Sequence, residues 1–252
     1  MQNIKHIICV ASGKGGVGKS TTAVNLALAL QSQDCRVGLL DADIYGPSLP
    51  LMMGVKPGTS PEIREQKFMC PIKAHGIECN SIGFLVDQRT AVVWRAPMMI
   101  SAFNQILGDT TWSNLDYLVV DMPPGTGDIQ LSLAQSVKIS GSVIVTTPQD
   151  VALLDARKGI EMFKKVDVPL LGIVENMSIH VCSNCGYEES IFGSGGGDSL
   201  SLDYGTEVIG RLPLDLTIRE QTDAGYPVVA SNPDHPAARA YVLLADKVAR
   251  RV

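Results

Sequence analysis

The sequence predicts an α/β fold in which a mostly parallel, doubly wound sheet forms the middle of three layers. Near-continuous apolar runs recur along the chain and alternate with segments of helical periodicity. Strands buried on both faces of a parallel sheet have this pattern, and the alternation predicts βαβ units with right-handed crossovers. Apolar residues form 45% of the 252 residues and charged residues 19%, which is typical of a compact globular protein. We expect one domain over residues 1–252.

The individual elements follow from these two periodicities. The apolar, β-rich runs predict six strands, at residues 6–12, 36–43, 116–123, 142–148, 169–177 and 208–213. The helical patterns predict helices at residues 19–33, 128–137, 151–166 and 237–251. Residues 57–84 are interpreted as a small hairpin insertion and not as a separate domain. Residues 178–199 are interpreted as irregular, with a flexible glycine-rich run at 193–199.

The net charge and the lack of long apolar segments argue against nucleic-acid and membrane partners. The formal net charge of -5 gives no overall attraction to nucleic acid or to an anionic membrane. The sequence has no apolar run long enough to span a bilayer and no signal-peptide pattern at its start. We therefore expect a cytoplasmic protein with no nucleic-acid partner and no stable membrane association. Its cysteines are expected to be reduced thiols or metal ligands.

A phosphate-binding loop stands between the first predicted strand and the first predicted helix. The spacing of Gly13, Gly18, Lys19 and Ser20 satisfies the Walker A pattern in the structural context that this pattern requires. Backbone N–H groups of such a loop surround phosphates, the lysine neutralises β- and γ-phosphate charge, and the hydroxyl binds Mg²⁺. The predicted ATP-binding residues are Gly13, Lys14, Gly15, Gly16, Val17, Gly18, Lys19, Ser20 and Thr21. The fold is thus expected to be that of a P-loop NTPase.

Four charged residues complete the predicted catalytic site. Lys14 is a second lysine within the loop, suited to stabilising transition-state charge on a γ-phosphate in a partner subunit. Asp121 ends a predicted strand and has the position of a Walker B carboxylate that holds Mg²⁺ through water. Asp41 and Asp43 end another strand; Asp43 is predicted to position the attacking water, and both are candidates for supporting the metal. The alternative for this pair is capping of the following turn.

Cys182 and Cys185 form the one closely spaced cysteine pair. They follow a predicted strand at the sheet edge where ligands bind in open α/β folds. Two thiolates do not complete a four-ligand site, whereas a twofold dimer supplies the same pair twice. The spacing alone is compatible with a 4Fe-4S cluster, zinc, a redox disulfide or a zinc turn without a present role. His180 is interpreted as a surface residue, and Cys9 and Cys79 as core residues.

Several motifs occur together and in order: KGGVGKS, DADIYGPS, VVDMPPGTGD, ENM and GRLPLD. With them the chain resembles, over almost its whole length, the Mrp (ApbC) family of deviant Walker ATPases. These are iron-sulfur cluster carriers related to the nitrogenase iron protein, MinD and ParA. The resemblance implies that Lys14 acts in trans across an ATP sandwich dimer and that Asp43 aligns water. It also implies that Asn176 and the loop around Pro213 contact adenine.

The resemblance implies a slow ATPase that carries a 4Fe-4S cluster, shared by a homodimer through Cys182 and Cys185, to recipient apoproteins. ATP and Mg²⁺ are the other expected ligands. The first alternative is a positioning ATPase like MinD or ParA, which needs a membrane or DNA anchor. The C-terminal run AARAYVLLADKVARRV is better explained as a helix packed on the sheet. A carboxylate-activating ligase is the second alternative, but it leaves the cysteine pair without a purpose.

Overall fold

The computed structural model describes residues 3–44, 46–85, 96–127, 130–132 and 136–252. An eight-stranded sheet runs through the molecule in the order β12-β9-β8-β1-β7-β2-β6-β5, and only β5 is antiparallel to its neighbour. Its strands are β1 (Ile4–Ala11), β2 (Val37–Asp41), β5 (Ile72–Ala74), β6 (Ile77–Ser81), β7 (Leu115–Asp121), β8 (Gly141–Thr146), β9 (Leu170–Glu175) and β12 (Val208–Arg211). The predicted doubly wound, mostly parallel sheet is confirmed.

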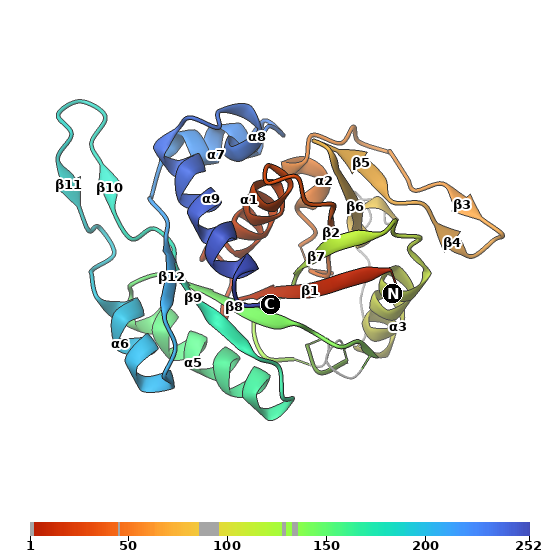
Figure 1. The fold of residues 1–252 in the computed structure, drawn as a ribbon, viewed down its shortest axis with the longest axis horizontal. Coiled ribbons are helices and arrows are strands. Elements are labelled where there is room, and N and C mark those ends of the chain that lie inside the picture. The colour runs from red at the N-terminus through yellow and green to blue at the C-terminus, as the bar shows by residue number, and fades with distance from the viewer. Residues whose placement is uncertain (1–2, 45, 86–95, 128–129, 133–135) are drawn as a thin grey trace.

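Helices cover both faces of this sheet (Figure 1). The helices are α1 (Lys19–Gln31), α2 (Leu49–Met52), α3 (Ala96–Asp109), α5 (Asp150–Lys165), α6 (Gly196–Tyr204), α7 (Leu216–Asp223), α8 (Val228–Ser231) and α9 (Pro236–Ala249), with a 3₁₀ turn η1 (Ile82–Phe84). Two small ribbons lie outside the sheet, β3 (Ile63–Arg64) with β4 (Phe68–Met69) and β10 (His180–Val181) with β11 (Glu188–Glu189). No helix in the described part of the chain is long and apolar enough to cross a membrane.

Alternation along each strand divides the core into two layers. Ile8 and Val10 of β1 pack on one face of the sheet with residues of α1, α8 and α9, whereas Ile7 and Cys9 pack on the other face with residues of α3, α5 and α6. Successive strand residues point to opposite faces, so a strand covered on both sides is apolar throughout. This burial explains the continuous hydrophobic runs in the sequence.

The carboxyl end of β1 lies at the topological switch point of the sheet. The chain leaves β1 through α1 to β2 on one side, whereas β8 and β9 extend the sheet on the other side. Crevices outside the carboxyl ends of such strands are where open α/β sheets bind ligands. The connections after β1, β2, β7 and β9 all lie at this edge and carry the predicted site residues.

Residues 57–84 contain the expected hairpin, formed by β5 and β6, whereas the expectation of a flexible run at residues 193–199 is wrong. Within residues 57–84, β6 joins the main sheet parallel to β2, because Ile77 and Cys79 add apolar side chains to the core. In the glycine-rich run, α6 begins at Gly196. A Cβ at Gly196 would lie 2.8 Å from the Pro148 carbonyl oxygen, and one at Gly197 would lie 2.8 Å from Glu175 Oε2. These glycines permit close packing.

The predicted elements otherwise agree with the structure to within a few residues at their ends. Of the helix predicted at 128–137, residues 130–132 and 136 are helical, Val137 forms a bend, and the others lie outside the described residues. The C-terminal helix packs on the sheet as expected, with Tyr241, Leu244, Ala245 and Val248 buried. Val242 is partly buried against the same core.

Candidate functional site

Glycines shape the loop between β1 and α1 because two of them have left-handed backbones and two meet neighbouring chain segments closely. Gly16 and Gly18 both have φ of 82°. A Cβ at Gly13 would lie 2.0 Å from the Asp155 carbonyl oxygen of α5, and one at Gly18 would lie 2.1 Å from Asn176 Nδ2. Side chains at these positions would strain the backbone or displace its neighbours. The loop is therefore held between α5 and the turn after β9.

A cavity of about 210 Å³ opens over this loop. Its lining includes Lys14, Lys19, Ser20, Asp43, Ser48 and Pro124. These residues come from the phosphate-binding loop, the segment after β2 and the segment after β7. The structure thus brings together Lys19 and Ser20, which were predicted to act on phosphate and Mg²⁺, and Asp43, which was predicted to position water; Lys14 lines the same cavity.

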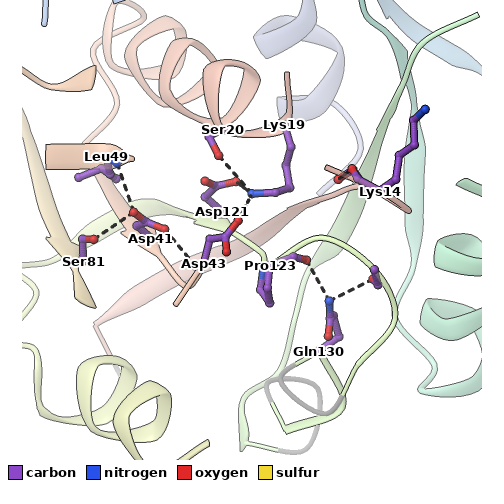
Figure 2. A network of polar contacts seen from close by, with 12 residues as sticks. Lys14, Lys19, Ser20, Asp41, Asp43, Leu49, Ser81, Asp121, Pro123 and Gln130 are labelled. Carbon is purple, nitrogen blue, oxygen red and sulfur yellow. Dashed lines mark hydrogen bonds and ion pairs between the residues drawn. The ribbon is translucent and has the colours of Figure 1, made fainter. Parts of the chain in front are cut away.

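Lys19 lies among carboxylates at the base of the cavity (Figure 2). Its Nζ is 2.5 Å from Asp121 Oδ1, 3.6 Å from Asp43 Oδ2 and 3.2 Å from Ser20 Oγ. Lys19 and Asp121 are 6% and 2% exposed. Carboxylate and hydroxyl oxygens are the ligands that Mg²⁺ prefers, and here they lie around one ammonium group.

Asp43 has an oxygen without a partner. One carboxylate oxygen faces Lys19, and the other, Oδ1, is buried and has no hydrogen-bond partner within the described chain. Burial raises the pKa of Asp43, the Lys19 charge opposes this shift, and the Asp121 charge adds to it. An unpaired buried carboxylate oxygen is costly unless a donor or cation reaches it. This atom fits the predicted contact to a water molecule or to Mg²⁺.

Asp41 is fully buried and both of its oxygens accept hydrogen bonds. Oδ1 accepts from the Asp43 amide at 3.0 Å, and Oδ2 accepts from the Leu49 amide at 3.2 Å and from Ser81 Oγ at 3.0 Å. Burial, followed by the charge of Asp121, raises the pKa of Asp41 to about 7. Through these hydrogen bonds, Asp41 connects the segment that carries Asp43 to α2 and β6. The proposed participation of Asp41 in metal binding stays a prediction.

Gln130 holds the segment that follows Asp121. Its Nε2 donates to the Pro123 carbonyl at 2.9 Å and to the Gly125 carbonyl at 3.0 Å, as Figure 2 shows. The Gly125 amide in turn donates to the carbonyl of Ser12, just before the phosphate-binding loop, at 2.9 Å. Gln130 is 1% exposed. It therefore ties the Walker B segment to the start of the phosphate-binding loop.

Lys14 differs from Lys19 in its direction. Its carbonyl accepts a hydrogen bond from Ser12 Oγ at 2.8 Å, whereas its side chain points away from Lys19, Asp43 and Asp121 in Figure 2. None of the ion pairs found in the described residues includes Lys14. The ammonium is thus directed outward from the carboxylates of its own site.

Asn176 lies beside the phosphate-binding loop, and Pro213 lies in a segment bonded to the turn that contains Asn176. The buried Asn176 side chain donates from Nδ2 to the Val17 carbonyl at 2.8 Å. Pro213 is half-buried and follows Leu212, whose amide donates to the Glu175 carbonyl at 2.9 Å. Asn176 therefore contacts the loop directly, and the Pro213 segment is joined to it through the Glu175 backbone. Their contact with adenine stays a prediction.

Cys182 and Cys185 lie in the turn of the β10–β11 hairpin, which projects from the body of the molecule in Figure 1. The Cys182 amide donates to the Tyr187 carbonyl at 2.9 Å, and the Gly186 amide donates to the Cys182 carbonyl at 2.8 Å. Backbone N–H groups, first that of Asn184 and then that of Cys185, lower the pKa of the Cys182 thiol. Hydrogen bonds of this kind favour the thiolate, which is the form that binds metal.

The hairpin carries no complete metal site by itself. In the described residues, no group of three or more His, Cys, Asp or Glu side chains is arranged to hold a metal ion. The ring of His180 is half-buried, and its Nδ1 lies 3.0 Å from the Leu214 carbonyl oxygen. Cys9 and Cys79 are buried, as expected for core residues, and burial raises the pKa of both thiols.

A protein-family model described as a ParA-type NUBPL iron-transfer P-loop NTPase matches residues 3–249. The chain belongs to this family. The resemblance drawn from the sequence motifs is thereby confirmed, and the phosphate-binding loop, the Asp121 segment and the cysteine hairpin described above are features of a NUBPL-type NTPase.

Relatives of this NUBPL-type chain are similar over most of their length. An iron-sulfur cluster carrier protein of Pseudomonas fragi is 60% identical over 97% of this chain and 85% of its own length. The carrier protein of Escherichia coli K12 is 55% identical over 100% and 68% of the two chains. The iron-sulfur cluster transfer protein NUBPL of mouse is 52% identical over 100% and 79%.

Solved structures show the same architecture. A nucleotide-binding protein of Archaeoglobus fulgidus in complex with ADP superposes with a TM-score of 0.79 at 35% identity, covering 94% of this chain and 92% of the other. The cell division ATPase MinD of Pyrococcus furiosus has a TM-score of 0.70 at 24% identity, covering 98% and 99%. The MinD likeness establishes the fold alone.

Two residues that support this NUBPL-type site from outside the cavity were not recognised in the sequence. Gln130 lies in a segment that was predicted only as a helix, and Glu175 ends a predicted strand beside Asn176. Both are buried polar residues, at 1% and 2% exposure. The sequence offered one signal for each residue, since Gln130 follows the Walker B segment and Glu175 belongs to the ENM motif. The burial of both side chains depends on tertiary packing, which the sequence does not show.

Proposed function

We propose that this protein is an ATP-hydrolysing carrier of a 4Fe-4S cluster, which it delivers to recipient apoproteins. The observation that carries the proposal is the Cys182 and Cys185 pair on a projecting hairpin, at the same sheet edge as a phosphate-binding loop. A site for handing on a metal cluster has to be accessible to a partner, and Cys185 is exposed. The names of the curated relatives support the same function.

The cluster is cargo that two copies of the chain would hold together. Each chain provides two closely spaced thiols, one of which has a lowered pKa, and a cubane cluster takes about four thiolate ligands. A twofold axis between the hairpins supplies the second pair without any further residue. Ligation at a protein surface also suits a cluster that is to be transferred.

ATP hydrolysis is the second half of the proposal. The loop of residues 13–21 would bind the phosphates, and Lys19 would move from its ion pair with Asp121 toward their charge. Ser20, Asp43 and Asp121, with Asp41 behind them, would hold Mg²⁺, which supplies charge neutralisation between the β- and γ-phosphates. Asp43 would orient the attacking water through its unpaired Oδ1.

Lys14 supports a dimeric arrangement of the ATPase. Because its side chain points away from its own carboxylates, a γ-phosphate bound by a second copy would be the suitable target. An outward-directed cation of this kind acts as an arginine finger does. Hydrolysis then removes the contacts that join the two copies, which gives nucleotide state control over the dimer and its cluster.

The test is anaerobic reconstitution of the purified protein with iron and sulfide, followed by visible absorption and by counts of iron and acid-labile sulfide. We expect about four of each per dimer. Cys182→Ala and Cys185→Ala should each abolish the cluster and leave ATP binding intact. Cys70→Ala is the matched control, because this half-buried cysteine lies on another part of the chain.

Full cluster retention in either hairpin variant would overturn the proposed site. Zinc alone, or no metal, in the wild-type protein would instead favour a positioning ATPase like MinD. Liposome sedimentation with and without ATP separates that function from a carrier, since a positioning ATPase of this type requires an ATP-dependent anchor. The carrier proposal expects the protein to remain in the supernatant under both conditions.

A further inference from the structure

The turn that follows β9 contacts both the phosphate-binding loop and the base of the cysteine hairpin. This β9 turn comprises residues 175–178, and β10 begins two residues later. Within it, Asn176 donates to the Val17 carbonyl, and a Cβ at Gly18 would lie 2.1 Å from Asn176 Nδ2. The turn and the loop are thus in direct contact, with no room for a side chain at Gly18.

Glu175 anchors the other side of the β9 turn. Its carboxylate is 2% exposed and accepts hydrogen bonds from the Gly197 amide at 2.6 Å and from Ser178 Oγ at 2.8 Å. The Nε of Arg211 lies 3.8 Å from the same carboxylate. Gly197 belongs to the first turn of α6, where free amides and the helix dipole favour an anion. Glu175 therefore connects Ser178, which leads into the hairpin, to α6.

Met177 has a backbone conformation that is uncommon for its residue type. Its φ is 54°, in the left-handed region that glycine and asparagine adopt more readily. A residue is held there only when its surroundings determine the conformation, and such residues concentrate at switch regions. Here the surroundings are the Asn176 contact on one side and the Ser178 contact on the other.

The base of the hairpin is fastened to the segment that contains Pro213. The Ser178 amide donates to the Leu212 carbonyl at 3.0 Å, and the Leu214 amide donates to the Ile179 carbonyl at 2.8 Å. The His180 ring nitrogen is 3.0 Å from the Leu214 carbonyl oxygen. The segment of Pro213 follows β12, which pairs with β9. The base of the hairpin therefore contacts the ends of both strands. The β9 turn, which also contacts the phosphate-binding loop, forms part of this base.

We propose that the β9 turn couples nucleotide binding at the phosphate-binding loop to the position of the cysteine hairpin, with Glu175 and Ser178 as positioning residues. The inference rests on the proposed carrier function and assigns its regulation to particular contacts. When the loop closes on phosphates, the Val17–Asn176 contact transmits the shift to the turn. Because Glu175 and Ser178 hold the turn rigid, the shift of the turn also moves the hairpin.

The test measures the thiols in metal-free protein and therefore needs no cluster. Iodoacetamide alkylation of Cys182 and Cys185 is followed by mass spectrometry without nucleotide, with ADP, and with a saturating non-hydrolysable ATP analogue and Mg²⁺. In the wild type we expect nucleotide to change the alkylation rate of the hairpin cysteines by about fivefold or more, within the usual range of coupling between sites. The alkylation rate of Cys70 should not change.

Glu175→Gln and Ser178→Ala should lose most of this nucleotide dependence while binding the nucleotide with unchanged affinity in calorimetric titration. Their matched controls are Glu188→Gln, an exposed glutamate of β11, and Ser190→Ala, an exposed serine beyond it. Both controls should keep the wild-type response. If Glu175→Gln fails to fold, Ser178→Ala carries the test, because it removes one hydroxyl and leaves the Glu175 contact to α6.

A wild-type protein whose thiols ignore saturating nucleotide would overturn the coupling. So would variants that keep the full response, since the response then arises elsewhere, for example from dimer contacts that cover the thiols. Reconstitution reports separately on the carrier function. If no cluster forms but alkylation of the thiols depends on nucleotide, the carrier function is rejected and the coupling is retained. If a cluster forms but alkylation does not depend on nucleotide, the carrier function is retained and the coupling is rejected.

Discussion

Replacing Asp41 by asparagine should change how the stability of the protein depends on pH. The buried Asp41 carboxyl has a pKa of about 7, against an ordinary value of 3.8 in an unfolded chain. Between these values the unfolded state has released the proton and the native state retains it. The free energy of unfolding therefore falls as pH rises through this window, and the stabilisation present below pH 4 is lost above pH 7.

The magnitude follows from the linkage relation. The slope is about 1.4 kcal/mol per pH unit where only the native state holds the proton, and it falls to half of that at the native pKa. Asp41 therefore lowers the free energy of unfolding by about 2 kcal/mol between pH 5 and pH 7. Asparagine has nearly the same shape and does not titrate. Its amide loses one of the two backbone hydrogen bonds, from Asp43 or from Leu49, at a pH-independent cost of about 1 kcal/mol.

Urea unfolding at pH 5, 6, 7 and 8, without nucleotide or Mg²⁺, measures the effect. The gap between Asp41→Asn and the wild type should shift by about 3 kcal/mol in favour of the variant from the lowest pH to the highest. Asp234→Asn is the control, because its side chain is 95% exposed, and it should follow the wild type. Parallel pH profiles for Asp41→Asn and wild type would refute the buried, protonated state of Asp41.

Two further predictions concern turnover. Lys14→Ala should bind ATP normally but release phosphate about 10³-fold more slowly, and mixing it with an inactive Asp43→Asn chain should restore some activity if Lys14 acts in trans. Unchanged turnover would exclude that role. Gln130→Ala leaves the Pro123 and Gly125 carbonyls without their donor, so kcat should fall with little change in ATP affinity and the protein should lose about 2 kcal/mol of stability. The exposed Gln105→Ala is its control; an equal loss in both variants would contradict the positioning role.

The main features of the fold could be predicted because they depend on local periodicity. Ile7 to Val10 alternate between two buried faces, so this part of β1 is continuously apolar. The Walker A spacing from Gly13 to Ser20 marks the passage from the strand to α1. The expected core positions of Cys9 and Cys79 are confirmed, and both cysteines lie in strands of the main sheet. In each case, the residue type and its neighbours in sequence carry the information.

The features that the sequence did not reveal depend on contacts between distant parts of the chain. Gly196 and Gly197 suggested flexibility, but they open a helix because the Pro148 carbonyl and the Glu175 carboxylate leave no room for a Cβ. Likewise β6, with its short alternating run, became a sheet strand because an exposed edge of β2 accepts it. Composition alone does not distinguish a glycine needed for close packing from one in a mobile loop.

The sequence by itself determined the α/β class, the phosphate-binding loop, the acidic residues that end two strands and the isolated cysteine pair, since each is a pattern of neighbouring residues. Only the tertiary structure decided which groups meet: Lys19 with Asp121, Gln130 with the Walker B segment, and Asn176 with Val17. It also fixed the outward direction of Lys14 and the burial of Asp41 and Glu175. Such pairings and pKa shifts arise from the packing of segments far apart in the chain. Burial there excludes water, and hydrogen bonds and charge interactions become stronger than they are in solvent.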